Sequence, residues 1–135
     1  MSQFKFYGAC KARLDKKGRF SVPASFRNEI SPNTFISLHS DNFLEVGEIK
    51  DMETLSASFM YYASPFIERF PKPDNEGRIV LPKSIRETLL GEDRATDLVI
   101  FGRGQSFGIC EATEWGRLEK SFLSKLSELS TQKPK

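Results

Sequence analysis

An internal repeat constrains the fold of this chain more than any other feature of its sequence. The segment 14–27 aligns with the segment 73–86 at a constant offset of 59 residues. Asp, Gly, Arg, Pro, Ser and Arg recur at equivalent positions, and the apolar positions stay apolar. Further on, 35–38 and 43–46 correspond to 98–101 and 107–110, with an offset of about 64 residues. The repeat therefore predicts two copies of one small unit within the 135 residues.

Each copy begins with two strands joined by a tight turn. Apolar residues alternate with basic or polar ones over 10–14 and again over 19–22, the period of half-buried strands. We expect these strands to pair as a hairpin across the sequence Asp-x-x-Gly-Arg. In the turns, Gly18 and Gly77 supply the positive φ, and the carboxylates of Asp15 and Asp74 accept hydrogen bonds from turn amides.

A short helix and two more strands complete each unit. Pro23 and Pro82 follow the hairpins and favour the first turn of a helix. The helices are expected to end near Ile30 and Leu90. The further strand pairs are 34–38 with 43–46, and 97–101 with 107–110.

The predicted fold class is α+β, mainly β, with two tandem ββαββ pseudo-repeats and flanking helices. A unit of fewer than about 50 residues cannot bury a full core alone, so the two units should pack on each other. The last helix covers this core or contacts a second chain, and the first interpretation is favoured. The predicted organisation is a first repeat (6–48), a linker helix (49–63), a second repeat (64–112), an amphipathic helix (113–129) and a disordered tail (130–135).

The charge of the chain is concentrated near its start. The first 30 residues carry seven basic and two acidic side chains, a net charge of +5, so that the remainder of a chain with +2 carries −3. This asymmetry indicates a localised contact with a negative partner, or a solvated charged face. There is no signal peptide and no long apolar run, which predicts a soluble, cytoplasmic protein without membrane contact.

Little in the sequence favours catalysis. Cys10 and Cys110 are interpreted as buried thiols, and their spacing matches no zinc or redox motif. His39 is the single histidine and is expected on the polar surface of a loop, without metal. No P-loop, nucleophile elbow or dinucleotide-binding glycine pattern occurs. We therefore expect no enzyme activity, no cofactor and no small-molecule substrate.

The motifs resemble those of a known family. They are Phe6-x-Gly8, Leu14-Asp15-x-Lys17-Gly18-Arg19, Pro23 and Phe26-Arg27, followed by Asp74-x-x-Gly77-Arg78 and Pro82. One such motif resembles the SpoVT-AbrB group, and two in tandem, over residues 6 to about 126, resemble the MraZ family of transcriptional regulators. The resemblance implies a swapped-hairpin (double-split) β-barrel in which strands of the two halves interleave, and ring-shaped homo-oligomers. It also implies a nucleoid-associated repressor that binds double-stranded DNA at repeated boxes before the division and cell-wall gene cluster.

Basic residues around the two motifs are the candidate DNA contacts. They are Arg19, Lys11, Arg13, Lys16, Lys17, Arg78 and Lys72. Arg19 and Arg78 either present a guanidinium fork to DNA or only lock the turn by pairing with Asp15 and Asp74. Arg27 and Arg86, at equivalent helix positions, either bind phosphate or bridge the two halves, and a structural role is favoured.

The second motif departs from the family pattern. Pro71 and Pro73 occupy positions of its first strand, which predicts an edge strand or an irregular segment. The region 64–90 has a net charge of only +1, so the second hairpin should contact DNA more weakly than the first. The alternative function is an antitoxin-like, protein-binding module of the same barrel group, although the tail beyond Leu129 is short and lacks apolar anchors.

Overall fold

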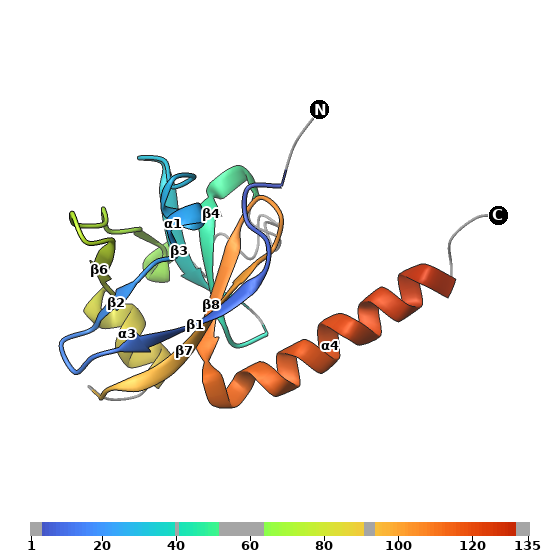
Figure 1. Cartoon of the computed structure of the whole chain (residues 1–135). Coiled ribbons are helices and arrows are strands. Elements are labelled where there is room, and N and C mark those ends of the chain that lie inside the picture. The colour runs from blue at the N-terminus through green and yellow to red at the C-terminus, as the bar shows by residue number, and fades with distance from the viewer. Residues whose placement is uncertain (1–3, 40, 52–63, 91–93, 132–135) are drawn as a thin grey trace.

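The computed structural model describes residues 4–39, 41–51, 64–90 and 94–131, and its fold is α+β, mainly β (Figure 1). Its strands are short and are connected by turns and brief helices, and one long helix follows the last strand. The strands are β1 (Ala9–Leu14), β2 (Arg19–Ser21), β3 (Thr34–Leu38), β4 (Leu44–Glu48), β5 (Glu68–Arg69), β6 (Arg78–Val80), β7 (Thr96–Gly102) and β8 (Phe107–Glu111). The helices are α1 (Ala24–Arg27), η1 (Ile49–Asp51), η2 (Ser64–Phe66), α3 (Lys83–Leu90) and α4 (Ala112–Thr131).

The strands form one large and one small antiparallel sheet. The large sheet has six strands in the order β1-β7-β8-β4-β3-β5, and the small one pairs β2 with β6. β1 and β5 are the edges of the large sheet, which is open, so the closed barrel stays a prediction. The position of the short strand β5 confirms the edge or irregular strand expected from Pro71 and Pro73, because a proline cannot donate to a central ladder.

The predicted pairing of 10–14 with 19–22 as a hairpin ladder is wrong. The turn between β1 and β2 is present, but β1 pairs with β7, and β2 pairs with β6. Strands from one half thus pair with strands from the other half, which is the interleaving that the family resemblance implies. This arrangement places Phe20 and Ile79 opposite each other with both side chains buried, which a local hairpin would not do.

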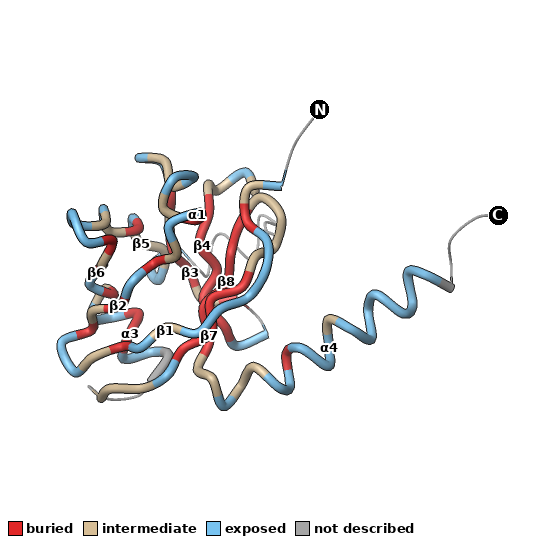
Figure 2. The backbone as a smooth tube through the Cα atoms, viewed as in Figure 1, coloured by how far each residue is buried: buried red, intermediate tan, exposed pale blue. Residues whose placement is uncertain are grey.

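The core joins both halves, as expected for units too small to fold separately. Its main cluster takes eight buried residues from each half, among them Leu14, Phe20, Ile79 and Leu98. A second cluster contains Phe43, Val99, Phe101, Cys110 and Leu118. Figure 2 shows this buried interior along β4, β7 and β8.

Helix α4 is packed against the core at its start and exposed at its end. Its first turns cover the second cluster, where the ring of Trp115 lies 4.9 Å from that of Phe101. Its last turns project away from the sheets and are largely exposed (Figures 1 and 2), including Leu123, Leu126 and Leu129. The core-covering interpretation is therefore confirmed for the start of the helix only.

Several boundaries differ from those predicted. Helix α1 has four residues rather than the eight expected from Pro23 to Ile30. After Asn28, the hydrogen bonds to the carbonyls of Phe26 and Arg27 span three residues, as in turns, and so do not continue the α-helix. Helix α3 ends as predicted at Leu90. Of the predicted linker helix, Ile49–Asp51 forms η1 and residues 52–63 lie outside the described residues. Residues 130–131 are helical, contrary to the predicted tail, and 132–135 lie outside the described residues.

Two side chains lie in surroundings opposite to those predicted. Cys10 is exposed and borders a crevice of about 160 Å³ beside Pro23 and Phe26. Cys110 is buried as predicted, and its burial raises the pKa of its thiol to about 12. His39 is buried rather than on the polar surface. Its ring stacks on Phe43 with centroids 4.2 Å apart, and its Nδ1 accepts a hydrogen bond from the Asp41 amide at 3.0 Å. Burial lowers the pKa of His39.

Candidate nucleic-acid interface

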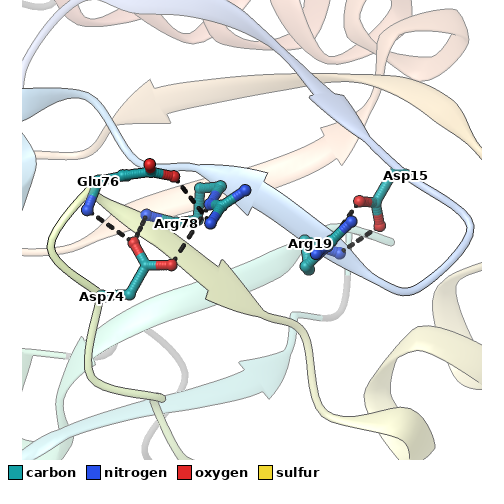
Figure 3. Close-up of polar contacts among 5 residues, drawn as sticks. All are labelled: Asp15, Arg19, Asp74, Glu76 and Arg78. Carbon is teal, nitrogen blue, oxygen red and sulfur yellow. Dashed lines mark hydrogen bonds and ion pairs between the residues drawn. The ribbon is translucent and has the colours of Figure 1, made fainter.

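The two repeated motifs meet in one structure, the two-stranded ribbon of β2 and β6. Arg19 lies opposite Val80, Phe20 opposite Ile79, and Ser21 opposite Arg78. The central pair faces the core, so Arg19, Ser21, Arg78 and Val80 form the outer face of the ribbon. Because the strands are antiparallel, the two arginines lie at opposite ends of this face (Figure 3).

Each end of the ribbon finishes in a turn built by its aspartate. Oδ1 of Asp15 accepts hydrogen bonds from the amides of Lys17 and Arg19, both at 2.9 Å, and Oδ2 accepts Arg19 Nε at 2.8 Å. The Arg19 amide and then its side chain hold the pKa of Asp15 below its ordinary value. Asp15 is therefore a charged anchor for Arg19 at neutral pH.

The second turn repeats this arrangement with one addition. Oδ1 of Asp74 accepts the amides of Glu76 at 2.9 Å and Arg78 at 3.0 Å, and Oδ2 accepts Arg78 Nε at 3.3 Å. The Arg78 amide is the main cause that lowers the pKa of Asp74. In addition, Arg78 Nη2 forms an ion pair with Glu76 at 2.7 Å.

The two arginines therefore differ in which of their guanidinium nitrogens remain available to a ligand. Arg19 is held by Nε alone, and its two terminal nitrogens bond to none of the described residues. The guanidinium of Arg78 is held at both Nε and Nη2 (Figure 3). Both side chains are a little over 40% exposed, so the difference lies in bonding rather than in access.

Arg27 and Arg86 bridge the two halves in a reciprocal way. Arg27, from the first half, packs on Gly77 of the second turn, and Arg86, from the second half, packs on Gly18 of the first turn. Both glycines have positive φ, 82° at Gly18 and 80° at Gly77. A Cβ at either glycine would collide with the opposite guanidinium. Each turn is thus held in place by the other half, through packing of a guanidinium on a bare backbone.

Backbone hydrogen bonds extend the same reciprocity. The Val22 amide donates to the Gly77 carbonyl at 3.0 Å, and the Leu81 amide donates to the Gly18 carbonyl at 2.7 Å. Arg27 Nη1 also donates to the Val22 carbonyl at 2.7 Å. The turns and the ribbon therefore form one unit that neither half can build alone.

The other predicted contact residues are distributed unevenly around this unit. Lys16 and Lys17 are exposed at the tip of the first turn. Lys11 and Arg13 lie on β1, in the other sheet, and Arg13 Nη1 donates to Asp97 Oδ1 at 2.9 Å. Lys72 lies before the second turn, at a cavity of about 590 Å³ shared with Arg27 and Arg69. The structure thus brings Arg19, Arg78, Lys16 and Lys17 together and leaves Lys11, Arg13 and Lys72 to the sides.

Sequence reasoning missed three parts of this arrangement. It assigned the arginines to separate hairpins, whereas they share one ribbon. It missed Asp97 as the partner of Arg13. It also gave no role to Val80, although the repeat aligns this residue with Ser21 and so marks a difference between the outward faces of the two halves.

The described residues contain neither a metal-binding cluster nor a membrane-spanning helix. Among them, no group of three or more His, Cys, Asp or Glu side chains could hold a metal ion. None of the described helices is both long enough and apolar enough to cross a membrane.

Comparison with known proteins identifies relatives that carry one common name. No protein-family model matches the chain. The transcriptional regulator MraZ of Mycoplasmopsis pulmonis is 28% identical over 86% of this chain and 85% of its own length. The protein of the same name from Thermobifida fusca is 26% identical over 94% and 95%. That of Clavibacter michiganensis subsp. michiganensis is 30% identical over 82% of this chain and 83% of its own. With this identity over most of both lengths, and with paired Asp-x-x-Gly-Arg turns on one ribbon, the chain belongs to the MraZ family of transcriptional regulators.

Proposed function

We propose that this transcriptional regulator binds double-stranded DNA in a sequence-specific way through the outer face of the β2–β6 ribbon. The observation that carries the proposal is the state of Arg19, which is oriented by Asp15 and keeps its terminal nitrogens available. A guanidinium fork held in this way matches the O6 and N7 acceptors of guanine in the major groove. A two-stranded ribbon is also narrow enough to enter that groove.

The first turn supplies the nonspecific part of the contact. Lys16 and Lys17 are exposed and lie at the end of the ribbon that carries Arg19. Lysines at this place would neutralise phosphates beside the groove, which contributes affinity through release of counterions. Lys11, Arg13, Arg78 and Lys72 are proposed as weaker, flanking contacts, because the structure sets them apart from the ribbon centre or pairs them with carboxylates.

The proposed assembly is a homo-oligomeric ring that represses the division and cell-wall gene cluster from repeated promoter boxes. One ribbon is a small footprint for specific binding, whereas several ribbons in one particle gain affinity through effective concentration. Leu123, Leu126 and Leu129 are exposed near the end of α4 and give an apolar face for contact between copies. Changing the three leucines to Gln should reduce the particle mass measured by light scattering. Unchanged mass would exclude this face.

A salt titration on the DNA upstream of the protein's own gene tests the proposal. Fluorescence anisotropy should give an affinity that falls linearly on a log-log plot, with a slope near 0.9 per phosphate neutralised. Footprinting should show protected boxes at a regular spacing. A flat salt response, or a partner retained after nuclease treatment of a pull-down, would contradict DNA binding and favour a protein partner.

A further inference from the structure

The outer face of the ribbon has a second feature, which the arginine contacts do not use. Val80 is 52% exposed, and no other large apolar side chain in the described strands is exposed. Its neighbours Ile79 and Leu81 are both buried. A single exposed apolar side chain is ordinary on a protein surface, so it is the position of Val80 beside the proposed DNA contacts that makes it informative.

The ribbon is nearly symmetric, and Val80 breaks the symmetry. The repeat offset of 59 relates Arg19 to Arg78 and Ser21 to Val80. In the ladder, Arg19 lies opposite Val80, and Arg78 lies opposite Ser21. One end of the outer face therefore presents a guanidinium beside an apolar group, and the other end presents a guanidinium beside a hydroxyl. Side chains directly opposite each other have Cβ atoms about 5 Å apart, near enough for adjacent base pairs stacked about 3.4 Å apart.

We propose that Val80 is a specificity-determining residue that contacts the C5-methyl group of a thymine next to the guanine bound by Arg19. This inference rests on the proposed function of the ribbon. The thymine methyl is the one apolar group among the base edges of the major groove, so an apolar side chain there selects thymine. Ser21, at the equivalent place, can bond to more than one base and selects less.

The tether on Arg19 makes the two contacts compatible. A valine is short, whereas an arginine that extended straight outward would keep the ribbon away from the bases. Arg19 Nε is bonded to Asp15 Oδ2 in the turn, so the guanidinium is drawn along the ribbon toward its end (Figure 3). Val80 and the Arg19 fork can then approach the groove floor together. The preferred site should therefore contain a guanine and a thymine at adjacent base pairs.

Removal of single methyl groups from the DNA tests this contact. The wild-type protein first selects duplexes from a random-sequence library, and each thymine of the best duplex is then replaced by deoxyuridine. One of these replacements should weaken binding about fourfold, which corresponds to ~0.8 kcal/mol for one buried methyl group. The thymine concerned should lie next to the guanine that the Arg19→Ala variant no longer selects. The Val80→Ser variant should bind the duplex with thymine at this position and the duplex with deoxyuridine there equally. Ser21→Ala is the matched control and should keep the full methyl effect.

An exchange of the two residues gives an independent readout. The double variant Ser21→Val with Val80→Ser should move the methyl preference to the thymine that neighbours the Arg78 end. Both residues are exposed, so thermal unfolding should match wild type. Selected duplexes that tolerate every deoxyuridine, or a preference that stays in place after the exchange, would overturn the contact while DNA binding stands. Failure to select any sequence would instead contradict the proposed function.

Discussion

The two turns of the ribbon have the same backbone and different surfaces. Around Asp15 and around Asp74 the same two amides bond to Oδ1, the same glycine has positive φ, and the arginine of the opposite half packs on that glycine. The first turn then adds two lysines, whereas the second adds Glu76, which pairs with its own arginine at 2.7 Å. The two copies of the unit therefore share the residues that shape the turn and differ in those exposed on its surface.

The largest expected difference between the turns is in DNA affinity. Arg19→Ala should weaken binding to the selected site by about 1–3 kcal/mol, the value of one bidentate base contact, and should relax selection at one position. Arg78→Ala should cost less, because this guanidinium is already paired with Glu76. Binding isotherms on both variants, with melting temperatures to confirm folding, measure the difference. Equal losses would show that the two ends of the ribbon act alike.

The shared backbone predicts a second effect, on stability. Gly18→Ala should destabilise the fold by at least about 1–2 kcal/mol, because a residue with Cβ is strained at positive φ and collides with Arg86. Gly77→Ala should cost a similar amount, since a Cβ there would collide with the Arg27 guanidinium, which is hydrogen-bonded to the Val22 carbonyl. Urea unfolding measures both. Gly116→Ala in α4, where a Cβ would meet nothing within 4 Å, is the control and should stabilise slightly.

The local features of the turns could be predicted from sequence, but their pairing could not. The positions of Asp15, Gly18 and Arg19 specify a tight turn, because the carboxylate and the glycine act within a few residues. Alternation with period 2 tells which face of a strand is buried and says nothing of the strand beside it. Periodicity therefore could not show that β2 would leave β1 and pair with β6, and only the family resemblance implied that strands of the two halves interleave. Contacts between distant residues, such as Arg13 with Asp97 or Arg86 with Gly18, could not be predicted for the same reason.

Release of Arg78 should make the second turn resemble the first. Glu76→Gln removes the carboxylate that holds Nη2, and it also removes a negative charge from the ribbon end. Because exposed ion pairs contribute up to about 1 kcal/mol, affinity for DNA should rise by up to about fivefold. The cost of Arg78→Ala should become larger in the Glu76→Gln background than in wild type. A simple additive result in this double-mutant cycle would mean that Glu76 does not restrain Arg78.

The smallest expected effects are those of the two aspartates on stability at acid pH. Both carboxyl groups have a pKa lowered in the folded chain, so the unfolded chain takes up their protons first as the pH falls. Their contribution to stability is therefore complete above about pH 4, the range of an unperturbed aspartate, and is lost as the pH falls through the lowered values. Asp15→Asn and Asp74→Asn should each reduce the acid sensitivity of thermal unfolding below pH 4, and to a similar extent, because the Oδ1 bonds are alike.

At neutral pH the same two variants should differ in their affinity for DNA. An asparagine can still accept the two backbone amides, but its NH2 group cannot accept the Arg19 Nε hydrogen bond that Oδ2 accepts at 2.8 Å. Asp15→Asn should therefore free the Arg19 guanidinium and weaken sequence-specific binding, with little change in the salt slope. Asp74→Asn should have a smaller effect, since Glu76 continues to hold Arg78. Anisotropy at pH 7 on both variants gives the comparison. Equal losses of affinity would mean that the aspartates act only by shaping the backbone of the turns.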